Sequence, residues 1–113
     1  MNIIAHPISR RILEGMLPGY FGDMVKAVVD IRLGLIGLDA ELHADIETEM
    51  LSQGSLQPDL WGVNIYPSDN EIFVEFDSLI NIRPYQNNPS RDVLDPDVRQ
   101  AILDIVNEII IND

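Results

Sequence analysis

Residues 71–83 alternate between apolar and polar side chains almost without interruption. Successive side chains of a strand point to opposite faces of a sheet, so this pattern predicts one long strand with a buried face and a polar face. The apolar positions are Ile72, Val74, Phe76, Ile80 and Ile82, and the polar ones are Glu71, Glu75, Asp77, Asn81 and Arg83. A row of carboxylates, an amide and a guanidinium makes the polar face a candidate site.

The chain has 113 residues, which is enough for one domain over residues 1–113 with a real core. The absence of cysteine excludes disulfides, thiolate metal sites and cysteine nucleophiles. The start, Met-Asn-Ile-Ile-Ala-His-Pro, lacks the pattern of a signal peptide, and no run of about 18 apolar residues occurs. We therefore expect a cytoplasmic protein that does not enter a membrane.

Acidic side chains dominate the middle of the chain. Its net charge is −12, no Lys or Arg occurs from residue 33 to residue 82, and ten acids lie between Asp39 and Asp77. Direct nucleic-acid binding requires basic side chains that displace counterions, so we expect none, and binding to anionic membranes is disfavoured for the same reason. The charge is typical of a soluble protein, and it also suits a cation site or a basic protein partner.

The first half of the chain predicts a helix, a hairpin and a second helix. Ser9 is placed to cap a helix over residues 10–21, which is expected to break near Leu17, next to Pro18, and to end at Gly22. Strands over residues 24–31 and 35–42, joined by a turn at 32–34, form the hairpin. Residues 44–53 are expected to be helical, with Gly54 at the end.

The second half predicts a strand over residues 60–66, a turn at 67–70, the long strand 71–83 and a loop over 84–94. Asp95 is expected to cap a last helix, with Pro96 in its first turn. The order α-β-β-α-β-β-α predicts an α+β fold, a two-layer sandwich. In it, two β-hairpins make a four-stranded antiparallel sheet with the helices packed on one face.

Five segments together resemble a small prokaryotic family of about 110 residues that is catalogued as a domain of unknown function. They are FGDMVKAVVD at residues 21–30, ELHAD at 41–45, DLWGVNIYP at 59–67, EFDSLINIRP at 75–84 and NPSR at 88–91. The resemblance covers most of the chain and implies no activity.

One candidate metal set joins the segment Glu41-x-His43-x-Asp45 to Asp77. An imidazole between carboxylates can bind Zn²⁺, Mn²⁺ or Fe²⁺, so Glu41, His43 and Asp77 are the candidate ligands of a divalent metal, with Glu75 or Asp30 as a catalytic base. A structural interpretation is also open, because His43 or Asp45 can cap the helix over residues 44–53.

Strand pairing is expected to gather polar residues on one open sheet face. A register that pairs polar with polar residues avoids burying carboxylates, and it would bring the following residues to that face. They are Lys26, Asp30, Glu41, His43, Asn64, Glu75, Asp77 and Arg83. An aromatic side chain beside polar groups suits a binding surface, so Tyr66 is a further candidate. Along the last strand, Glu75 with Asp77 and Asn81 with Arg83 are local pairs, and a salt-bridged face is the structural alternative.

The loop over residues 83–91 places two arginines around amides and a hydroxyl. Such a loop can hold a carboxylate or phosphate through Arg83 and Arg91, or it can be a connector that satisfies its own backbone. Its other candidate ligand-binding residues are Gln86, Asn88 and Ser90.

These observations favour a small binding module that takes a ligand or a protein partner on its acidic sheet face, with self-association as a homodimer expected. The alternative is a hydrolase-like enzyme that depends on the divalent metal, in which Arg83 or Arg91 holds an anionic substrate. No other cofactor is predicted, because no phosphate-binding glycine motif occurs.

Overall fold

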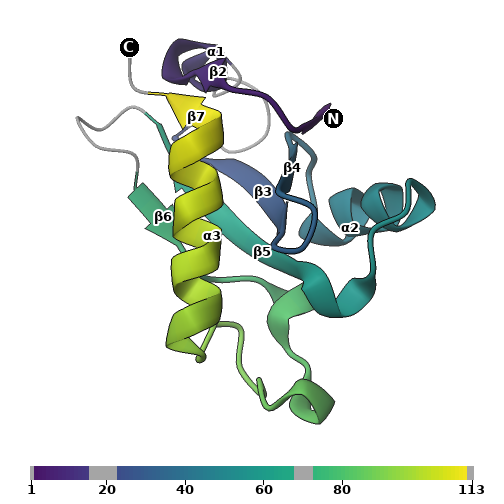
Figure 1. Cartoon of the computed structure of the whole chain (residues 1–113). Helices are drawn as coiled ribbons and strands as arrows, with labels where there is room; N and C mark the ends of the chain where they lie inside the picture. Colours follow the sequence, from purple (N-terminus) through teal and green to yellow (C-terminus); the bar gives the residue numbers. More distant parts are fainter. Residues whose placement is uncertain (1, 16–22, 68–72, 112–113) are drawn as a thin grey trace.

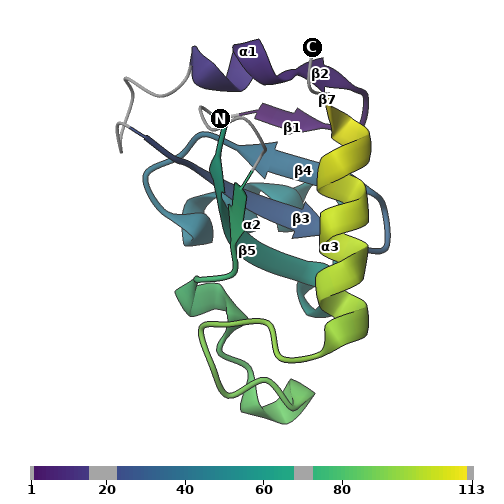
Figure 2. The same ribbon diagram turned by 90° about the vertical axis from the view of Figure 1, so that its left-hand side faces the viewer.

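A five-stranded antiparallel sheet organises the computed structural model, which describes residues 2–15, 23–67 and 73–111 (Figures 1 and 2). The strands lie in the order β1-β4-β3-β5-β6. Their bounds are β1 Asn2–Ile4, β3 Val25–Asp30, β4 Leu35–Leu38, β5 Leu60–Tyr66 and β6 Phe73–Glu75. The mixed α+β class predicted from the sequence is confirmed, whereas the sheet has five strands and not four.

The predicted hairpin is confirmed as β3 and β4, which pair from Ala27 with Leu38 to Asp30 with Leu35. Its turn is held by the Asp30 carboxylate, whose Oδ1 accepts the N–H groups of Arg32 and Leu33, each at 2.9 Å. Gly34 follows with φ +70°, a conformation that favours glycine. Strand β4 ends at Leu38, four residues before the predicted end, because Asp39 turns the chain away with φ 67°.

Short strands near the two ends of the chain were not predicted, because two or three residues carry no readable period. Strand β1 adds to the outer edge of β4, and β2 (Ile8–Ser9) pairs in parallel with β7 (Ile110–Ile111). Helix α1 (Arg10–Glu14) follows β2 and begins as predicted at Ser9, whose side chain accepts the N–H of Arg11. The predicted break near Leu17 and stop at Gly22 lie outside the described residues.

Helices cover both faces of the sheet, and the prediction that they pack on one face is wrong (Figures 1 and 2). Helix α3 (Pro96–Ile109) lies on one face and α2 (His43–Ser52) on the other. The reason lies in the central strands, because β3 and β5 bury apolar side chains of both parities. On the α3 face Ala27, Val29 and Val63 pack with Ile102 and Val106, and on the α2 face Val28 and Leu60 pack with Ile46 and Met50.

The long strand predicted over residues 71–83 is also wrong. Residues 71 and 72 lie outside the described part, and β6 ends at Glu75. Residues 76–83, which we call the crossing segment, then pass over β5 on the α2 side of the sheet. They include the 3₁₀ helix η2 (Leu79–Asn81), which Ser78 caps by accepting the N–H of Ile80. Two further 3₁₀ turns, η1 (Gln57–Asp59) and η3 (Pro84–Gln86), lie before β5 and inside the predicted loop.

The crossing segment is held by a side chain that acts like a neighbouring strand. Asn81 Oδ1 accepts the N–H of Gly62 at 2.8 Å, and Asn81 Nδ2 donates to the Gly62 carbonyl at 2.9 Å. Both backbone groups at the middle of β5 are thereby satisfied, although β6 ends before it could pair with them. An alternating polar position thus becomes a buried contact and not part of an open face.

Two further predictions for the second half are confirmed, whereas the predicted turn at 67–70 lies outside the described residues except for residue 67. Strand β5 has the predicted bounds, and α3 begins at Asp95, whose side chain accepts the N–H of Asp97, with Pro96 in the first turn. Among the described residues no helix is long and apolar enough to cross a bilayer.

Gly62 is required by this crossing. A Cβ at residue 62 would lie 2.5 Å from both Cβ and Oγ of Ser78, closer than side-chain atoms pack. We expect Gly62→Ala to lower the free energy of unfolding by about 1–3 kcal/mol, measured by urea denaturation.

The double variant Gly62→Ala with Ser78→Gly supplies the control, because it removes the Ser78 atoms that the new methyl meets. Its destabilisation should be smaller than the sum of the two single effects. A simple sum would show that the close approach of Ser78 to Gly62 is not what requires the glycine.

Candidate functional site

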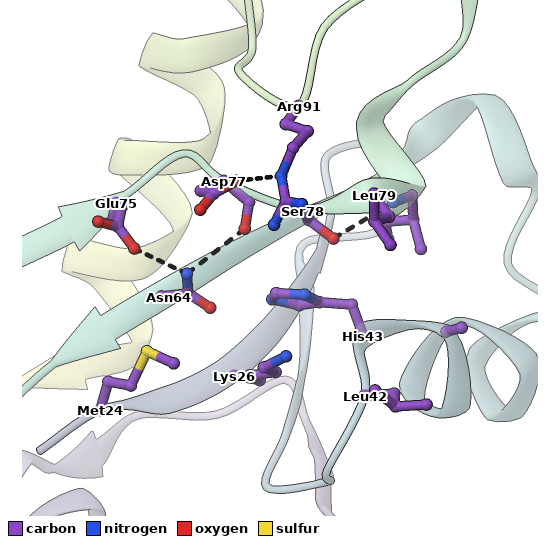
Figure 3. Close-up of a pocket in the computed structure, with 12 residues that line it drawn as sticks. Met24, Lys26, Leu42, His43, Asn64, Glu75, Asp77, Ser78, Leu79 and Arg91 are labelled. Carbon is purple, nitrogen blue, oxygen red and sulfur yellow. Dashed lines mark hydrogen bonds and ion pairs between the residues drawn. The ribbon is translucent and has the colours of Figure 1, made fainter. Parts of the chain in front are cut away.

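A pocket of about 300 Å³ lies on the α2 face of the sheet, between the start of α2 and the crossing segment (Figure 3). We call it the sheet-face pocket. It is lined by Met24, Lys26, Leu42, His43, Ala44, Asn64, Glu75, Asp77, Ser78, Leu79, Ile80 and Arg91. Of the sequence-predicted site residues, the structure therefore brings Lys26, His43, Asn64, Glu75, Asp77 and Arg91 together, and their part in binding stays a prediction.

The back of the pocket is one polar row across three strands. Lys26 of β3 pairs with Asn64 of β5, and Asn64 pairs with Glu75 of β6. Residues that pair directly across antiparallel strands project from the same face. The sequence predicted this row correctly, because its three members follow from strand period and register alone.

Asn64 stands at the centre of the row and is only 5% exposed. Its Nδ2 donates to Glu75 Oε1 at 2.8 Å and, more weakly, to the Asp77 carbonyl at 3.4 Å. Because both partners are acceptors, the amide nitrogen is fixed on that side and the oxygen on the other. Oδ1 is buried without a hydrogen-bond partner in the described structure, and Figure 3 shows it turned toward the open centre of the pocket.

His43 forms the opposite wall at the first residue of α2. Its Nε2 lies 2.8 Å from the Val63 carbonyl, so this nitrogen carries the proton and donates it. The neutral ring then presents Nδ1 as an acceptor. Burial lowers the pKa of His43, against the opposing effect of the bond to Val63; the charges of Lys26 and Arg91 lower it further and that of Asp77 raises it.

The rim of the pocket carries an exposed ion pair. Arg91 Nε lies 2.6 Å from Asp77 Oδ1, and the two side chains are 54% and 44% exposed. Glu75 is held from the side by Tyr66, whose hydroxyl donates to Glu75 Oε1 at 3.3 Å. Tyr66 does not line the pocket, and burial followed by the nearby Glu75 charge raises the pKa of its phenol.

Several other candidate residues hold the framework below the pocket. Asp30 is fully buried; besides holding its turn through Oδ1, its Oδ2 accepts the Ser55 hydroxyl at 2.7 Å, so it does not reach the pocket. Asn88 Nδ2 donates to the carbonyls of Asn81, Ser90 and Asp92 and so ties the loop together. Asn81 is occupied by Gly62, as described above.

Arg83 is a buried clamp between the loop and the start of β5. Its guanidinium donates to the carbonyls of Gln57 and Leu60, the latter at 2.7 Å, and stacks 4.1 Å from the centre of the Trp61 ring. Burial lowers the pKa of Arg83.

The loop's other polar side chains are also engaged. Gln86 Nε2 donates to the Pro58 carbonyl at 2.9 Å, and Ser90 Oγ accepts the N–H of Asp92 at 3.0 Å. Arg83 and Gln86 thus tie the loop to residues 57–60, whereas Asn88 and Ser90 bond backbone groups within residues 81–92.

The proposed metal ligands do not converge. Glu41 lies exposed before α2, His43 uses Nε2 for Val63, and Asp77 is paired with Arg91. Within residues 2–15, 23–67 and 73–111, no three His, Cys, Asp or Glu side chains are placed to hold a metal ion.

The apolar lining was not predicted. Met24 and Leu42 directly precede β3 and α2, while Ala44 and Leu79 lie in the first turns of α2 and η2, and hydrophobic periodicity gives no signal at such ends. Ile80, which the alternation assigns to the buried face, packs against the core on the α2 face and also borders the pocket.

Comparison with known proteins gives one match. Residues 2–109 match the model of the family described as "Protein of unknown function (DUF5674)", and the chain belongs to this family. The comparisons with curated proteins and with solved structures give no match.

The lowered pKa of His43 makes stability depend on pH with a definite sign. The unfolded chain takes up a proton below about pH 6.5 that the folded chain resists, so the His43 contribution is complete above that pH and is lost as the pH falls toward the folded pKa. We expect the free energy of unfolding to fall between about pH 7.5 and about pH 5.5, and His43→Gln to reduce this slope.

His6→Gln is the matched control, because His6 is exposed at the N-terminal end. Urea denaturation at several pH values should show the wild-type slope in this variant. An unchanged slope in His43→Gln would contradict the assignment of the pH dependence to His43.

Proposed function

We propose that this protein is a binding module that holds a small organic molecule in the sheet-face pocket. The observation that carries the proposal is Asn64 Oδ1, a buried acceptor with no partner in the described structure that faces a hollow. Leaving a buried polar group unpaired costs about 1–3 kcal/mol. A ligand that donates an N–H or O–H group to this oxygen would recover that free energy on binding.

The composition of the pocket supports the same function. Small-molecule sites are concave, mostly apolar and provided with a few convergent polar groups, and they start at about 300 Å³. Here Leu42, Leu79 and Ile80 supply apolar wall, while Asn64, Glu75 and His43 supply polar atoms. The volume suits a compact ligand.

The polar atoms are also held in place before any ligand arrives. Asn64 is fixed by Glu75, His43 by Val63, and Glu75 by Tyr66 as well. Such preorganisation reduces the entropy lost on binding. It favours a binding site over an incidental surface hollow.

A metal-dependent hydrolase is less well supported. The acidic and histidine side chains of the pocket are engaged with protein partners, and no metal-binding set forms among the described residues. Binding of a small molecule requires only Asn64 Oδ1, the sheet-face pocket and its apolar lining, all of which are present.

The test is a screen of small polar fragments by thermal shift, followed by ¹⁵N NMR of the compounds that raise the melting temperature. We expect binders to perturb the amide signals of the residues that line the pocket. Asn64→Ala should weaken these binders about tenfold or more, because the ligand loses its hydrogen bond to Oδ1.

Tyr85→Phe is the control, because it removes a hydroxyl that donates to Gln57 Oε1 at 2.8 Å, and neither Tyr85 nor Gln57 lines the pocket. Its binding should stay close to wild type. A screen in which no fragment perturbs the pocket, or in which Asn64→Ala binds as well as wild type, would overturn the proposal.

A further inference from the structure

The sheet-face pocket has an acceptor end. Asn64 Oδ1 lies there without a partner, and the Glu75 carboxylate is its neighbour in the polar row. Asn64 is only 5% exposed, so its amide is not a surface group that water solvates. The chemistry that satisfies this end is a hydrogen-bond donor, and a positively charged one gains from Glu75 as well.

The facing wall has a donor end. Helix α2 is ten residues long and starts at the pocket, where His43 and Ala44 belong to the lining. The preceding residue is Leu42, and no side chain caps the helix. The first backbone N–H groups of a helix have no partner within it and carry partial positive charge, so this uncapped start attracts an anion.

Two cationic side chains add positive charge to the pocket. Lys26 approaches it from β3, in the row with Asn64, and Arg91 approaches it from the loop after η3 and is paired with Asp77. Asp45 in the first turn of α2 is exposed and is not among the lining residues. Its negative charge therefore reduces the positive potential at the start of the helix without entering the pocket.

Apolar side chains form the wall of the pocket between its acceptor end and its donor end. Leu42 and Leu79 are 53% and 66% exposed, which is unusual for leucine, and both border the hollow together with Met24. A ligand with a short aliphatic group would cover this apolar surface.

We propose that the ligand of the sheet-face pocket is a small zwitterion of the α-amino acid class with an aliphatic side chain. Its carboxylate lies at the N-terminus of α2, its ammonium group donates to Asn64 Oδ1 and faces Glu75, and its side chain packs on Leu42 and Leu79. This inference rests on the proposed function and names the class of molecule that the pocket takes.

The test compares three probes that share one isobutyl group: leucine, 3-methylbutylamine, which lacks the carboxylate, and 4-methylpentanoate, which lacks the ammonium group. Binding is followed by ¹⁵N NMR titration of the full chain. We expect leucine to bind, with the largest shifts at the amides of His43 and Ala44 and at the Asn64 side chain. Each truncated probe should bind about tenfold or more weakly.

Variants separate the two ends of the pocket. Glu75→Gln should weaken leucine and 3-methylbutylamine while leaving 4-methylpentanoate unchanged, because only the first two carry the ammonium group. Glu108→Gln is the control, since Glu108 carries the same charge but is exposed on α3 and outside the lining, and it should change none of them.

Failure of this inference is distinguishable from failure of the proposed function. Fragments that bind with dependence on Asn64 while leucine does not, or a truncated probe that binds as tightly as leucine, would overturn the amino-acid assignment and leave the binding pocket standing. The absence of any binder that perturbs the pocket would overturn both.

Discussion

The paired hydrogen bonds between the Asn81 amide and the backbone of Gly62 determine how the chain runs over the α2 face of the sheet. Without a partner, the N–H and carbonyl of Gly62 would be buried and unsatisfied at the middle of β5. With Asn81 as the partner, the chain leaves β6 after three residues and crosses the sheet. Gly62 in turn is the residue that lets Ser78 approach the strand closely.

The crossing divides this face into a filled part and a hollow part. Toward Val28 and Leu60, the face is covered by Ile46 and Met50 of α2. Toward Lys26, Asn64 and Glu75, it is bordered by the crossing segment but left open. The sheet-face pocket is therefore a consequence of where the crossing segment leaves β6.

The framework under the crossing explains why polar residues of the loop are buried. Asn88 donates to three carbonyls of the loop, and Arg83 donates to two carbonyls before and at the start of β5. Each side chain replaces a backbone partner that an irregular segment lacks. Their burial fixes the loop, and through it Arg91 at the rim of the pocket.

The sequence predicts those helices and strands whose signals lie within the element or at its ends. The bounds of strand β5 and the start of helix α3 at Asp95 are marked by residues within or next to each element, and both were predicted. Lys26, Asn64 and Glu75 could be placed in one row, because strand period and pairing suffice. Helices on both faces were readable in principle, since β3 and β5 carry apolar residues at both parities.

The course of residues 76–83 could not be predicted, because its alternation is the same as that of a strand. The energy that decides against a strand comes from Asn81 meeting Gly62, nineteen positions away in the chain. A one-dimensional pattern contains no information about that contact. The same applies to Leu79, whose place at the pocket depends on the crossing and not on its neighbours in sequence.

The charge of the pocket differs from the charge of the chain. The chain carries −12, yet the pocket lining combines Lys26 and Arg91 with Glu75 and Asp77, and His43 is neutral there because burial lowers its pKa. Both acids come from the stretch between residues 33 and 82 that lacks Lys and Arg, and both cations come from outside it. The fold thus brings two of only seven basic residues to one hollow. A site for a simple cation gains nothing from that pairing, whereas a ligand that carries both signs of charge gains at each end.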